Sequence, residues 1–404
     1  MAEPVIVATA RSPIGRAFKG SLVDLRPDDL AADIVRAALA KVPQLEPTEV
    51  EDLMLGCGLP GGEQGFNMGR VVSVLAGLPA VPGCTITRYC APSLQTMRMA
   101  AHAIRAGEGE IFVAAGVETV SRFRKGTSDN VPDTMNPRFT EAQERTAERA
   151  EDDADDWKPV QDGLPDIYIS MGQTAENVAQ IEGISRAEMD AFAARSQQRA
   201  VQSQADGFFA REISPVTTPS GVTVATDDGP RPGTTVEGLA QLPAVFRPGG
   251  RVTAGNACPL NDGAAAVVIM SADRARSLDI APLARIVSTG VSALDPEIMG
   301  LGPVEASRQA LGRAGMTIDQ IDLVEINEAF AAQVIPSARQ LGIDSDRLNV
   351  HGGSIAVGHP FGMTGARIMT TLLNGLQTAD ATLGLETMCV AGGQGMAMVV
   401  ERLS

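Results

Sequence analysis

The chain has 404 residues, of which 44% are apolar, and a formal net charge of −16 at pH 7. This length supports two core domains with a large buried interior, and the excess of acid argues against nucleic acid as a partner. No apolar run is long enough to span a bilayer, and the five cysteines lack the paired spacing of a disulfide framework or a zinc site. The N-terminus has no basic region followed by an apolar one, so we expect no export signal and a cytoplasmic location.

The first part of the chain alternates strand and helix patterns, which is typical of a soluble α/β protein. Strands are expected at residues 5–8, 50–56, 85–89 and 111–116. Apolar residues recur at helical spacing from Leu94 to Ile104, and Gly107 follows them. This pattern predicts a helix over residues 91–106.

Cys90 stands at the junction between the expected strand at 85–89 and this helix. A thiol at such a junction faces the positive end of the helix dipole, which favours thiolate over thiol. A lone cysteine is more often a small buried apolar residue, so a catalytic role for Cys90 depends on partners elsewhere in the chain.

Residues 121–246 break the alternating pattern and are rich in charge, proline and glycine. Ser185 and Glu188 form a capping-box sequence, which predicts a helix running to about Ala205. Residues 141–156 hold much of the acidic charge and are expected to be a solvated loop or helix. We interpret the whole stretch as an insertion between two core halves.

The second half repeats the arrangement of the first. Strands are expected at residues 264–270, 321–327 and 387–391, and His359 lies in the glycine-rich turn 358–360. Gly56 and Cys90 are 34 positions apart, and Asn327 and His359 are 32 apart, which suggests an internal duplication. Open α/β sheets bind ligands at strand-to-helix turns of this kind. A nucleophilic cysteine, a histidine to take its proton and Cys389 as acid or base would together perform acyl transfer.

Five motifs resemble those of the thiolase family, whose members make or cleave 3-ketoacyl-CoA thioesters. They are Arg88-Tyr89-Cys90, residues 253–265 (TAGNACPLNDGAA), 327–331 (NEAFA), 352–360 (GGSIAVGHP) and 389–393 (CVAGG). The resemblance covers nearly the whole chain and implies an acyltransferase of fatty-acid metabolism. It also implies an α/β fold in which duplicated βαβαβαββ halves form a layered α/β/α/β/α core. The expected domains are residues 1–120 plus 247–275, an inserted CoA-binding loop domain at 121–246, and residues 276–404.

The resemblance also implies roles for the site residues. Cys90 would attack the thioester carbonyl and hold the acyl group, and His359 would be its base. His359 would also donate to the thioester oxygen, together with a water held by Asn327. Cys389 would move a proton at the α-carbon of acetyl-CoA, and the backbone N–H groups of Cys90 and Ala391 would form an oxyanion hole.

Substrate binding is predicted from the same comparison. CoA thioesters are expected as substrates, without a tightly bound cofactor or metal, in a homodimer or homotetramer. Arg231 would contact the nucleotide end of CoA within a positive patch that includes Arg122, Arg124 and Lys125, although a solvated loop arginine is the alternative. Matches to the positions that line the acyl and pantetheine pocket are Met171, Phe246, Cys258, Ala329 and Phe330, each of which could equally be core.

Three positions depart from the family pattern. Ala391 replaces a glycine, Ala91-Pro92-Ser93 follows the nucleophile where small residues and a glycine are usual, and Cys258 replaces a serine, so that it could equally be a small filler. Residues 129–156 match no thiolase motif. The remaining Cys57, Cys84, His102 and His351 are expected to be structural.

Two other functions fit parts of the pattern. A decarboxylating ketoacyl synthase shares the fold and the nucleophilic cysteine, but it lacks the terminal Cys-x-x-Gly-Gly motif and uses histidines at two sites. A catalytically idle CoA- or lipid-binding relative would be expected to have lost a site residue, whereas here all four are present. The motifs do not distinguish synthesis from cleavage, or one acyl chain length from another.

Overall fold

The computed structural model describes residues 2–129, 131–151 and 157–404. The strands of its main sheet are β1 (Pro4–Arg11), β2 (Gly15–Arg16), β3 (Asp52–Gly56), β4 (Gly83–Ile86), β5 (Ile111–Thr119), β8 (Asn261–Ser271), β9 (Ala284–Ala293), β10 (Leu323–Ile326), β11 (Leu383–Val390) and β12 (Gln394–Arg402). Its core helices are α1 (Pro27–Leu39), α2 (Met68–Leu75), α3 (Pro92–Ala106), α8 (Ala272–Ser277), α9 (Gly302–Ala314), α10 (Ala331–Leu341), α11 (Ser354–Val357) and α12 (Thr364–Thr378).

The main sheet is mixed and consists of two similar halves. Its strand order is β10-β11-β12-β9-β1-β8-β5-β3-β4, with β2 paired to β8. In one half β3, β4 and β5 are parallel and β8 and β1 antiparallel, and in the other β10 and β11 are parallel and β12 and β9 antiparallel. The halves join where β1 meets β9, through Val5 opposite Arg285 and Ile6 opposite Ala284. The predicted repeat of the strand pattern is therefore confirmed.

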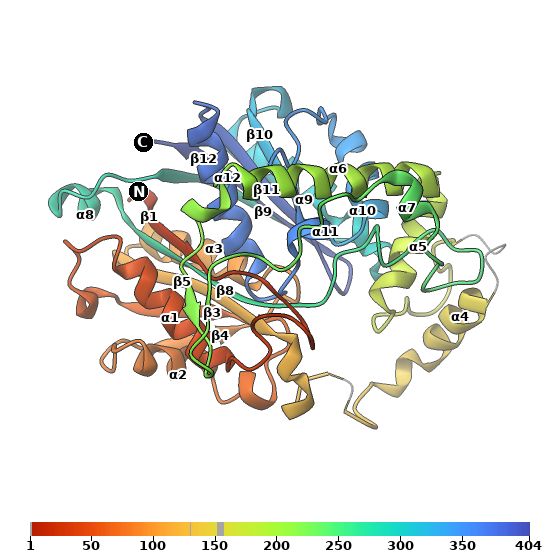
Figure 1. Cartoon of the computed structure of the whole chain (residues 1–404), viewed down its shortest axis with the longest axis horizontal. Helices are drawn as coiled ribbons and strands as arrows, with labels where there is room; N and C mark the ends of the chain where they lie inside the picture. The colour runs from red at the N-terminus through yellow and green to blue at the C-terminus, as the bar shows by residue number, and fades with distance from the viewer. Residues whose placement is uncertain (1, 130, 152–156) are drawn as a thin grey trace.

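Three hydrophobic clusters divide the molecule into layers. Helices α3 and α12 pack on each other between the two halves, and their apolar side chains share one cluster with strands of both. Helices α1 and α2 cover the outer face of the N-terminal half, and α9 and α10 cover that of the C-terminal half (Figure 1). The layered α/β/α/β/α arrangement follows from these clusters, and it places α3 and α12 at the centre.

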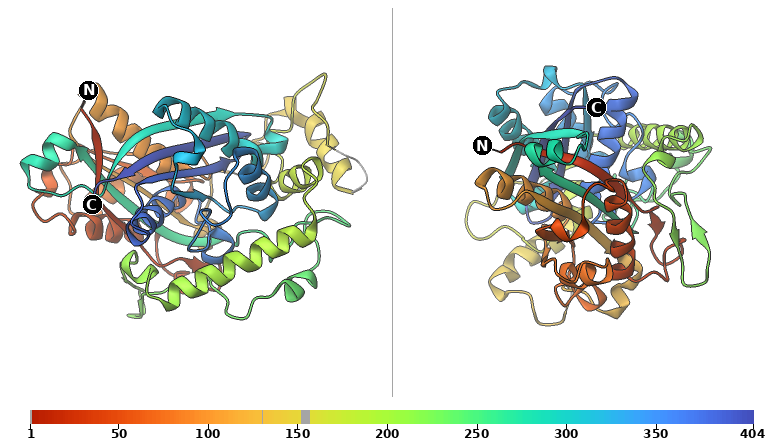
Figure 2. Two further views of the ribbon diagram at one scale, coloured as in Figure 1. Left: turned by 90° about the horizontal axis from the view of Figure 1, so that it is seen from above. Right: turned by 90° about the vertical axis from the view of Figure 1, so that its left-hand side faces the viewer.

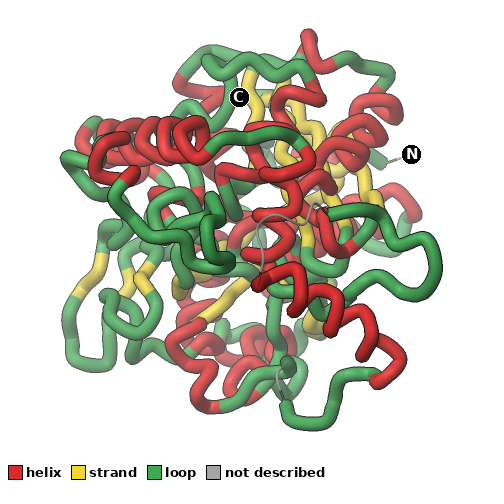
Figure 3. Tube along the Cα trace, turned by 90° about the vertical axis from the view of Figure 1, so that its right-hand side faces the viewer, coloured by secondary structure: helices red, strands yellow, loops and turns green. Residues whose placement is uncertain are grey.

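The insertion lies mainly against the C-terminal half. It contains α4 (Thr140–Glu151), α5 (Met171–Ile181), α6 (Arg186–Ala205), α7 (Val236–Ala240) and the hairpin strands β6 (Val216–Thr217) and β7 (Thr223–Val224). Apolar residues of α5 and α6 belong to the same cluster as α9 and α10. Figure 2 shows α6 running along the outside of the core, and Figure 3 shows this side of the molecule as mostly helix and loop.

Most of the predicted elements are present, with small changes in their ends. The capping box at Ser185 and Glu188 is formed, as predicted, and α6 ends at Ala205. Helix α4 occupies the first part of the acidic stretch with Ala142 as its one buried residue, whereas residues 152–156 of that stretch lie outside the described residues. Among the described residues, no helix is long and apolar enough to cross a membrane.

The ends of the strand expected at residues 85–89 were predicted wrongly. β4 covers 83–86, because the backbone turns directly after it. The Ala91 N–H donates to the Arg88 carbonyl at 2.9 Å, and Tyr89 has a φ of 41°. The residues before the nucleophile therefore form a tight turn rather than an extended strand.

Candidate active site

The turn at Tyr89 and Cys90 presents the nucleophile two residues before α3 begins. Ala91 is the N-cap of that helix, and Pro92 occupies its first position, where the missing N–H has no intrahelical partner. Tyr89 adopts the left-handed region, which costs a bulky residue about 1–3 kcal/mol unless its surroundings enforce it. Pro92 is thus accommodated, and the strain is stored in the residue next to Cys90.

The predicted preference of Cys90 for the thiolate is wrong for the free enzyme. Burial raises the pKa of the Cys90 thiol to about 11, and the negative charge of Glu118 acts in the same direction. The backbone N–H of Ala391 donates to the sulfur and lowers the pKa, but by less. Cys90 is therefore a neutral thiol at neutral pH and needs a base to become a nucleophile.

His359 reaches the same region because the N-terminal turns of α3 and α12 touch. Ser93 Oγ accepts a hydrogen bond from the Ala366 N–H at 3.0 Å. The buried carboxylate of Glu118 joins the halves a second time, since it accepts from the N–H groups of Gly58 at 2.7 Å and Gly362 at 2.9 Å. These contacts bring the turn 359–362 beside the nucleophile turn.

The backbone at His359 is held by Asn261. The Asn261 Oδ1 accepts from the His359 N–H at 3.0 Å, and Asn261 Nδ2 donates to the Gly15 carbonyl at 3.0 Å. Gly358 has a φ of 113°, and a Cβ there would lie 2.6 Å from the Asn261 Cγ. Glycine is therefore required before His359 for both conformation and space.

A chain of hydrogen bonds fixes the orientation of the Asn327 amide. Arg367 can only donate, and its Nη2 donates to Ser354 Oγ at 2.8 Å. The single hydroxyl proton of Ser354 is then directed to Asn327 Oδ1, at 2.6 Å. Asn327 must therefore present its Nδ2 group, and not its oxygen, to His359.

The same chain determines the tautomer of His359. Asn327 Nδ2 lies 3.2 Å from His359 Nε2, so Nε2 is the acceptor and the ring proton is on Nδ1. Nδ1 lies 2.6 Å from Thr364 Oγ1, whose own proton goes to the Pro360 carbonyl at 2.7 Å. Burial lowers the pKa of His359 to about 3, and the charge of Arg367 adds to this effect. His359 is thus neutral, and Nε2, whose lone pair accepts from Asn327 here, is the ring atom that could take a proton as a general base.

Cys389 completes the group of predicted catalytic residues. It is fully buried on β11, and burial raises its pKa well above the ordinary value, followed by the effects of Cys90 and Cys258. The three sulfurs therefore lie within electrostatic reach of one another. Among the described residues, no group of three metal-ligating side chains is positioned to hold an ion.

Ala391 retains the backbone donor that the predicted oxyanion hole needs. It is outside the left-handed region, whereas the next two residues, Gly392 and Gly393, have φ values of 78° and 74°. The position itself therefore accepts an alanine without strain, and its N–H points to the sulfur of Cys90.

Several predicted substrate contacts lie together near the thiols. Phe246 and Phe330 meet edge to face with ring centroids 6.3 Å apart. The Cys258 N–H donates to the Ala329 carbonyl at 3.0 Å, which places the Cys258 side chain beside the site. Met171 lines the cavity that contains Cys90.

The basic residues near Arg231 are not those that the sequence predicted. Arg231 is exposed, its N–H donates to Gln197 at 2.8 Å, and its pKa is lowered by partial desolvation and by the charge of Arg16. Arg122 instead pairs with Glu63 at 2.7 Å. The charged neighbour of Arg231 is therefore Arg16. The basic residues at 122–125 do not take that place, because Arg122 forms an ion pair with Glu63.

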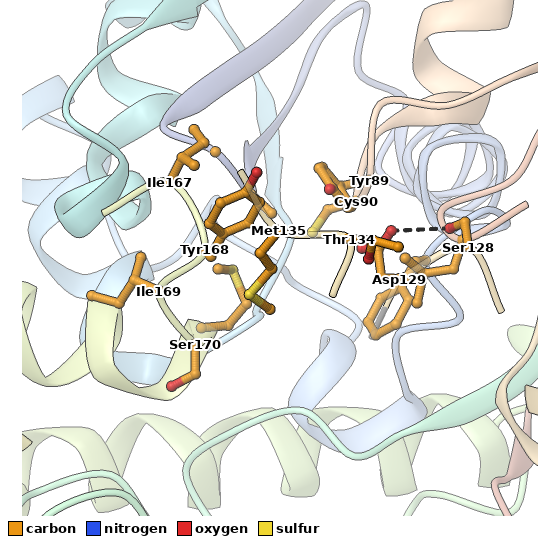
Figure 4. Close-up of a pocket in the computed structure, with 15 residues that line it drawn as sticks. Tyr89, Cys90, Ser128, Asp129, Thr134, Met135, Ile167, Tyr168, Ile169 and Ser170 are labelled. Atoms are coloured by element: carbon orange, nitrogen blue, oxygen red, sulfur yellow. Dashed lines mark hydrogen bonds between the residues drawn. The ribbon is translucent and has the colours of Figure 1, made fainter. Parts of the chain in front are cut away.

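A cavity of about 500 Å³ opens over Cys90 (Figure 4). Ala391 lines it beside Cys90, and the insertion contributes the opposite wall through residues 128–129, 134–135 and 167–171. Asp129, Met135 and Tyr168 belong to this wall, and the sequence analysis missed them. No motif could have indicated Asp129 or Met135, since residues 129–156 match no pattern of the family.

Comparison with known proteins matches this architecture to one family along the whole chain. The family model for the N-terminal domain of thiolase matches residues 4–273, and that for the C-terminal domain matches residues 280–402. A crystal structure of the acetyl-CoA acetyltransferase of Bacillus anthracis is similar at a TM-score of 0.85 and 36% identity, covering 100% of this chain and 99% of the other.

Curated relatives of similar length have three different names. The chain is 42% identical to the beta-ketoadipyl-CoA thiolase of Acinetobacter baylyi and to the acetyl-CoA acetyltransferase of Pseudomonas aeruginosa, with 100% of both chains covered in each case. It is also 42% identical to the 3-ketoacyl-CoA thiolase of Bacillus subtilis, over 99% of this chain and 100% of that protein.

Proposed function

The chain belongs to the thiolase family and is an acyltransferase that exchanges acyl groups between acyl-CoA and acetyl-CoA, and we propose that Cys90, His359, Asn327 and Cys389 carry out this reaction. The observation that carries the assignment is the convergence of the nucleophile turn, the His359 turn and Cys389 at one buried place between the two halves.

In the first half-reaction, His359 Nε2 takes the proton of the Cys90 thiol as the sulfur attacks the thioester carbonyl. The bond between the carbonyl carbon and the CoA sulfur breaks, and the proton passes to the departing CoA thiolate. The negative oxygen of the tetrahedral intermediate would accept from His359 in its protonated form and from a water bound to Asn327. The product is an acyl group on Cys90 and free CoA.

In the second half-reaction, the thiolate form of Cys389, which its raised pKa makes the minor form in the free protein, removes a proton from the α-carbon of acetyl-CoA. The resulting carbanion attacks the acyl-Cys90 carbonyl, and the N–H groups of Cys90 and Ala391 would stabilise the oxyanion. The carbon–sulfur bond to Cys90 breaks, 3-ketoacyl-CoA leaves, and the proton from the α-carbon finally resides on the Cys90 sulfur. Thiolysis is the same sequence in reverse.

CoA would be held by the insertion at 121–246, acting as a loop domain. The pantetheine arm would pass Phe246, Phe330, Ala329, Met171 and Cys258, which lie near the thiols. Arg231 would meet the phosphates of the nucleotide end, and the neighbouring charge of Arg16 supports this role in a chain with a net charge of −16.

We also propose a homodimer formed through the free edge of the sheet at β4. Its residues are only half-buried, and Phe66 is 93% exposed in the turn before α2. An unpaired edge strand with an exposed aromatic residue nearby favours pairing with another chain. Light scattering should give twice the chain mass for the parent and a smaller mass for Phe66→Asp.

Intact-mass spectrometry tests the assignment of the nucleophile. Mixing with acetyl-CoA should add one acetyl group to the parent protein and none to Cys90→Ala. Cys258→Ala is the matched control, because it removes a neighbouring thiol, and it should still be acetylated. Acetylation that persists in Cys90→Ala would contradict the proposed mechanism.

A further inference from the structure

We propose that the cavity over Cys90 selects uncharged acyl groups longer than acetyl and rejects acyl groups with a terminal carboxylate, and that Asp129 makes this distinction. The proposal rests on the role of Cys90 as the acyl carrier, because an acyl group on that sulfur would extend into the cavity. It assigns a substrate class that the family alone leaves open, since the names of the relatives include both beta-ketoadipyl and acetyl substrates.

The shape of the cavity indicates an acyl group larger than acetyl. The space of about 500 Å³ falls within the range of pockets that enclose whole small-molecule ligands. Its far wall contains Met135, Ile167 and Tyr168, which lie across from Tyr89 and Cys90 in Figure 4. An acetyl group on Cys90 would leave most of this wall without contact, whereas a longer chain would cover it. The thioether of Met135 can adapt to chains of different shape.

The charge of the cavity decides what the far end of that chain can be. Among the described residues that line it, Asp129 is the only charged one. The Asp129 carboxylate accepts from Ser128 Oγ at 3.1 Å and is also hydrogen-bonded to the Tyr89 hydroxyl. Two neutral donors thus hold the negative charge beside the residue that precedes the nucleophile.

A carboxylate at the end of the acyl chain would meet this charge in a cavity whose described lining residues include no cation. Arg88 borders a neighbouring hollow that shares Tyr89 and Asp129, but its guanidinium donates to the Gln394 side chain at 2.7 Å. Burial lowers the pKa of Arg88. The negative charge of Asp129 would repel a carboxylate at the end of the acyl chain, and such repulsion is an effective means of rejecting a ligand. The cavity therefore disfavours acidic acyl groups.

The test compares thiolysis of 3-ketooctanoyl-CoA, which is uncharged at its far end, with thiolysis of beta-ketoadipyl-CoA. The parent protein should show a kcat/KM at least roughly tenfold higher for the uncharged substrate, the effect of one partly solvated like-charge contact. Asp129→Asn keeps the shape of the side chain and removes the charge, so it should reduce this ratio by roughly tenfold. Asp133→Asn is the matched control, because Asp133 is an exposed acid of the same loop outside the cavity, and it should leave the ratio unchanged.

Two results would overturn the proposal. One is a parent protein that cleaves beta-ketoadipyl-CoA as efficiently as the uncharged substrate, which would mean that Arg88 or another cation receives the carboxylate. The other is a ratio that stays the same in Asp129→Asn, or that changes equally in Asp133→Asn. Failure of the proposed function looks different, because Cys90 would then acquire no acyl mass from any acyl-CoA.

Discussion

Replacing Thr364 with valine should damage catalysis through the tautomer of His359. Valine keeps the shape of threonine and removes the hydroxyl that accepts from His359 Nδ1 at 2.6 Å and donates to the Pro360 carbonyl at 2.7 Å. Thr364 and His359 are almost completely buried, so water cannot replace the hydroxyl as the acceptor for His359 Nδ1. A buried donor left without an acceptor costs about 1–3 kcal/mol, whereas the Pro360 carbonyl still accepts from the Met363 N–H at 3.0 Å.

The cost falls on the tautomer that the reaction needs. Without Thr364 Oγ1, the form with its proton on Nδ1 loses about 1–3 kcal/mol of support, while Asn327 Nδ2 still opposes the other form. We therefore expect kcat/KM for thiolysis to fall by about 10–100-fold, less than the ~10²–10⁴-fold loss typical of removing a general base altogether. The free energy of unfolding should fall by about 1–3 kcal/mol.

The assay is steady-state thiolysis together with the rate of Cys90 acylation, measured by quenched-flow mass spectrometry. Thr364→Ser retains the hydroxyl and should keep both rates close to those of the parent. Nitrogen NMR of labelled histidine should show the Nδ1–H tautomer in the parent and in Thr364→Ser, and a mixture in Thr364→Val. The reasoning is refuted if Thr364→Val acylates at the parental rate, or if Thr364→Ser is impaired as much as the valine variant.

Three further predictions concern other parts of the site. Cys389→Ala should still accept an acyl group on Cys90 but lose about 10²–10⁴-fold in condensation and thiolysis, because the proton at the α-carbon has no acceptor or donor; near-normal turnover would make Cys389 a packing residue. Arg231→Ala should raise the KM for CoA substrates at low ionic strength with little change in kcat, an effect that shrinks at high salt, and an unchanged KM would identify it as a solvated loop residue. The pKa of His359 is about 3 in the folded chain and 6.5 in the unfolded chain. As the pH falls, the unfolded chain therefore protonates this histidine first. The free energy of unfolding should therefore decline below about pH 6.5, as urea titration can measure, and decline less in His359→Asn; an equal decline in both would assign the effect to other groups.

The sequence predicted the parts of this protein that depend on local pattern. The periodicity around Leu94 and the capping box at Ser185 are properties of neighbouring residues, and they gave α3 and α6 almost to the residue. The motifs likewise pointed to Cys90, His359 and Cys389, whose roles stay predictions, and each of these residues lies among the residues that shape its turn. The pKa of Cys90 was predicted in the wrong direction, since the dipole of α3 was visible in the sequence and the burial of the thiol was not.

What could not be predicted depends on residues that meet only in the folded chain. Ser354 and Thr364 are ordinary small polar residues in the sequence, and their roles follow from the contacts with Asn327 and His359. Asp129 was part of an unmatched stretch, and only the cavity shows that it stands beside Tyr89. Arg122, Arg124 and Lys125 were predicted to lie near Arg231 because all four are basic. In the folded chain, Arg122 instead pairs with Glu63.

The duplication of the fold explains why the proposed nucleophile, Cys90, and its proposed base, His359, come from opposite ends of the chain. Each half places a helix in the central layer, and α3 and α12 pack together so that Ser93 of one receives a hydrogen bond from Ala366 of the other. Residues that precede the two helices are therefore brought together by the symmetry of the architecture.

The buried side chain of Arg367, on α12, determines which way the hydrogen bonds at this junction run. Arg367 carries only N–H donors; burial lowers its pKa, and the acidic side chains of Glu325 and Glu386, which lie opposite each other on β10 and β11, oppose that effect. Because Arg367 can only donate, each hydroxyl and amide that follows it has one permitted orientation, ending with the lone pair of His359 Nε2. Replacing Arg367 with a residue that can also accept would remove that direction, so the orientation of the proposed base depends on a buried side chain that does not line the cavity.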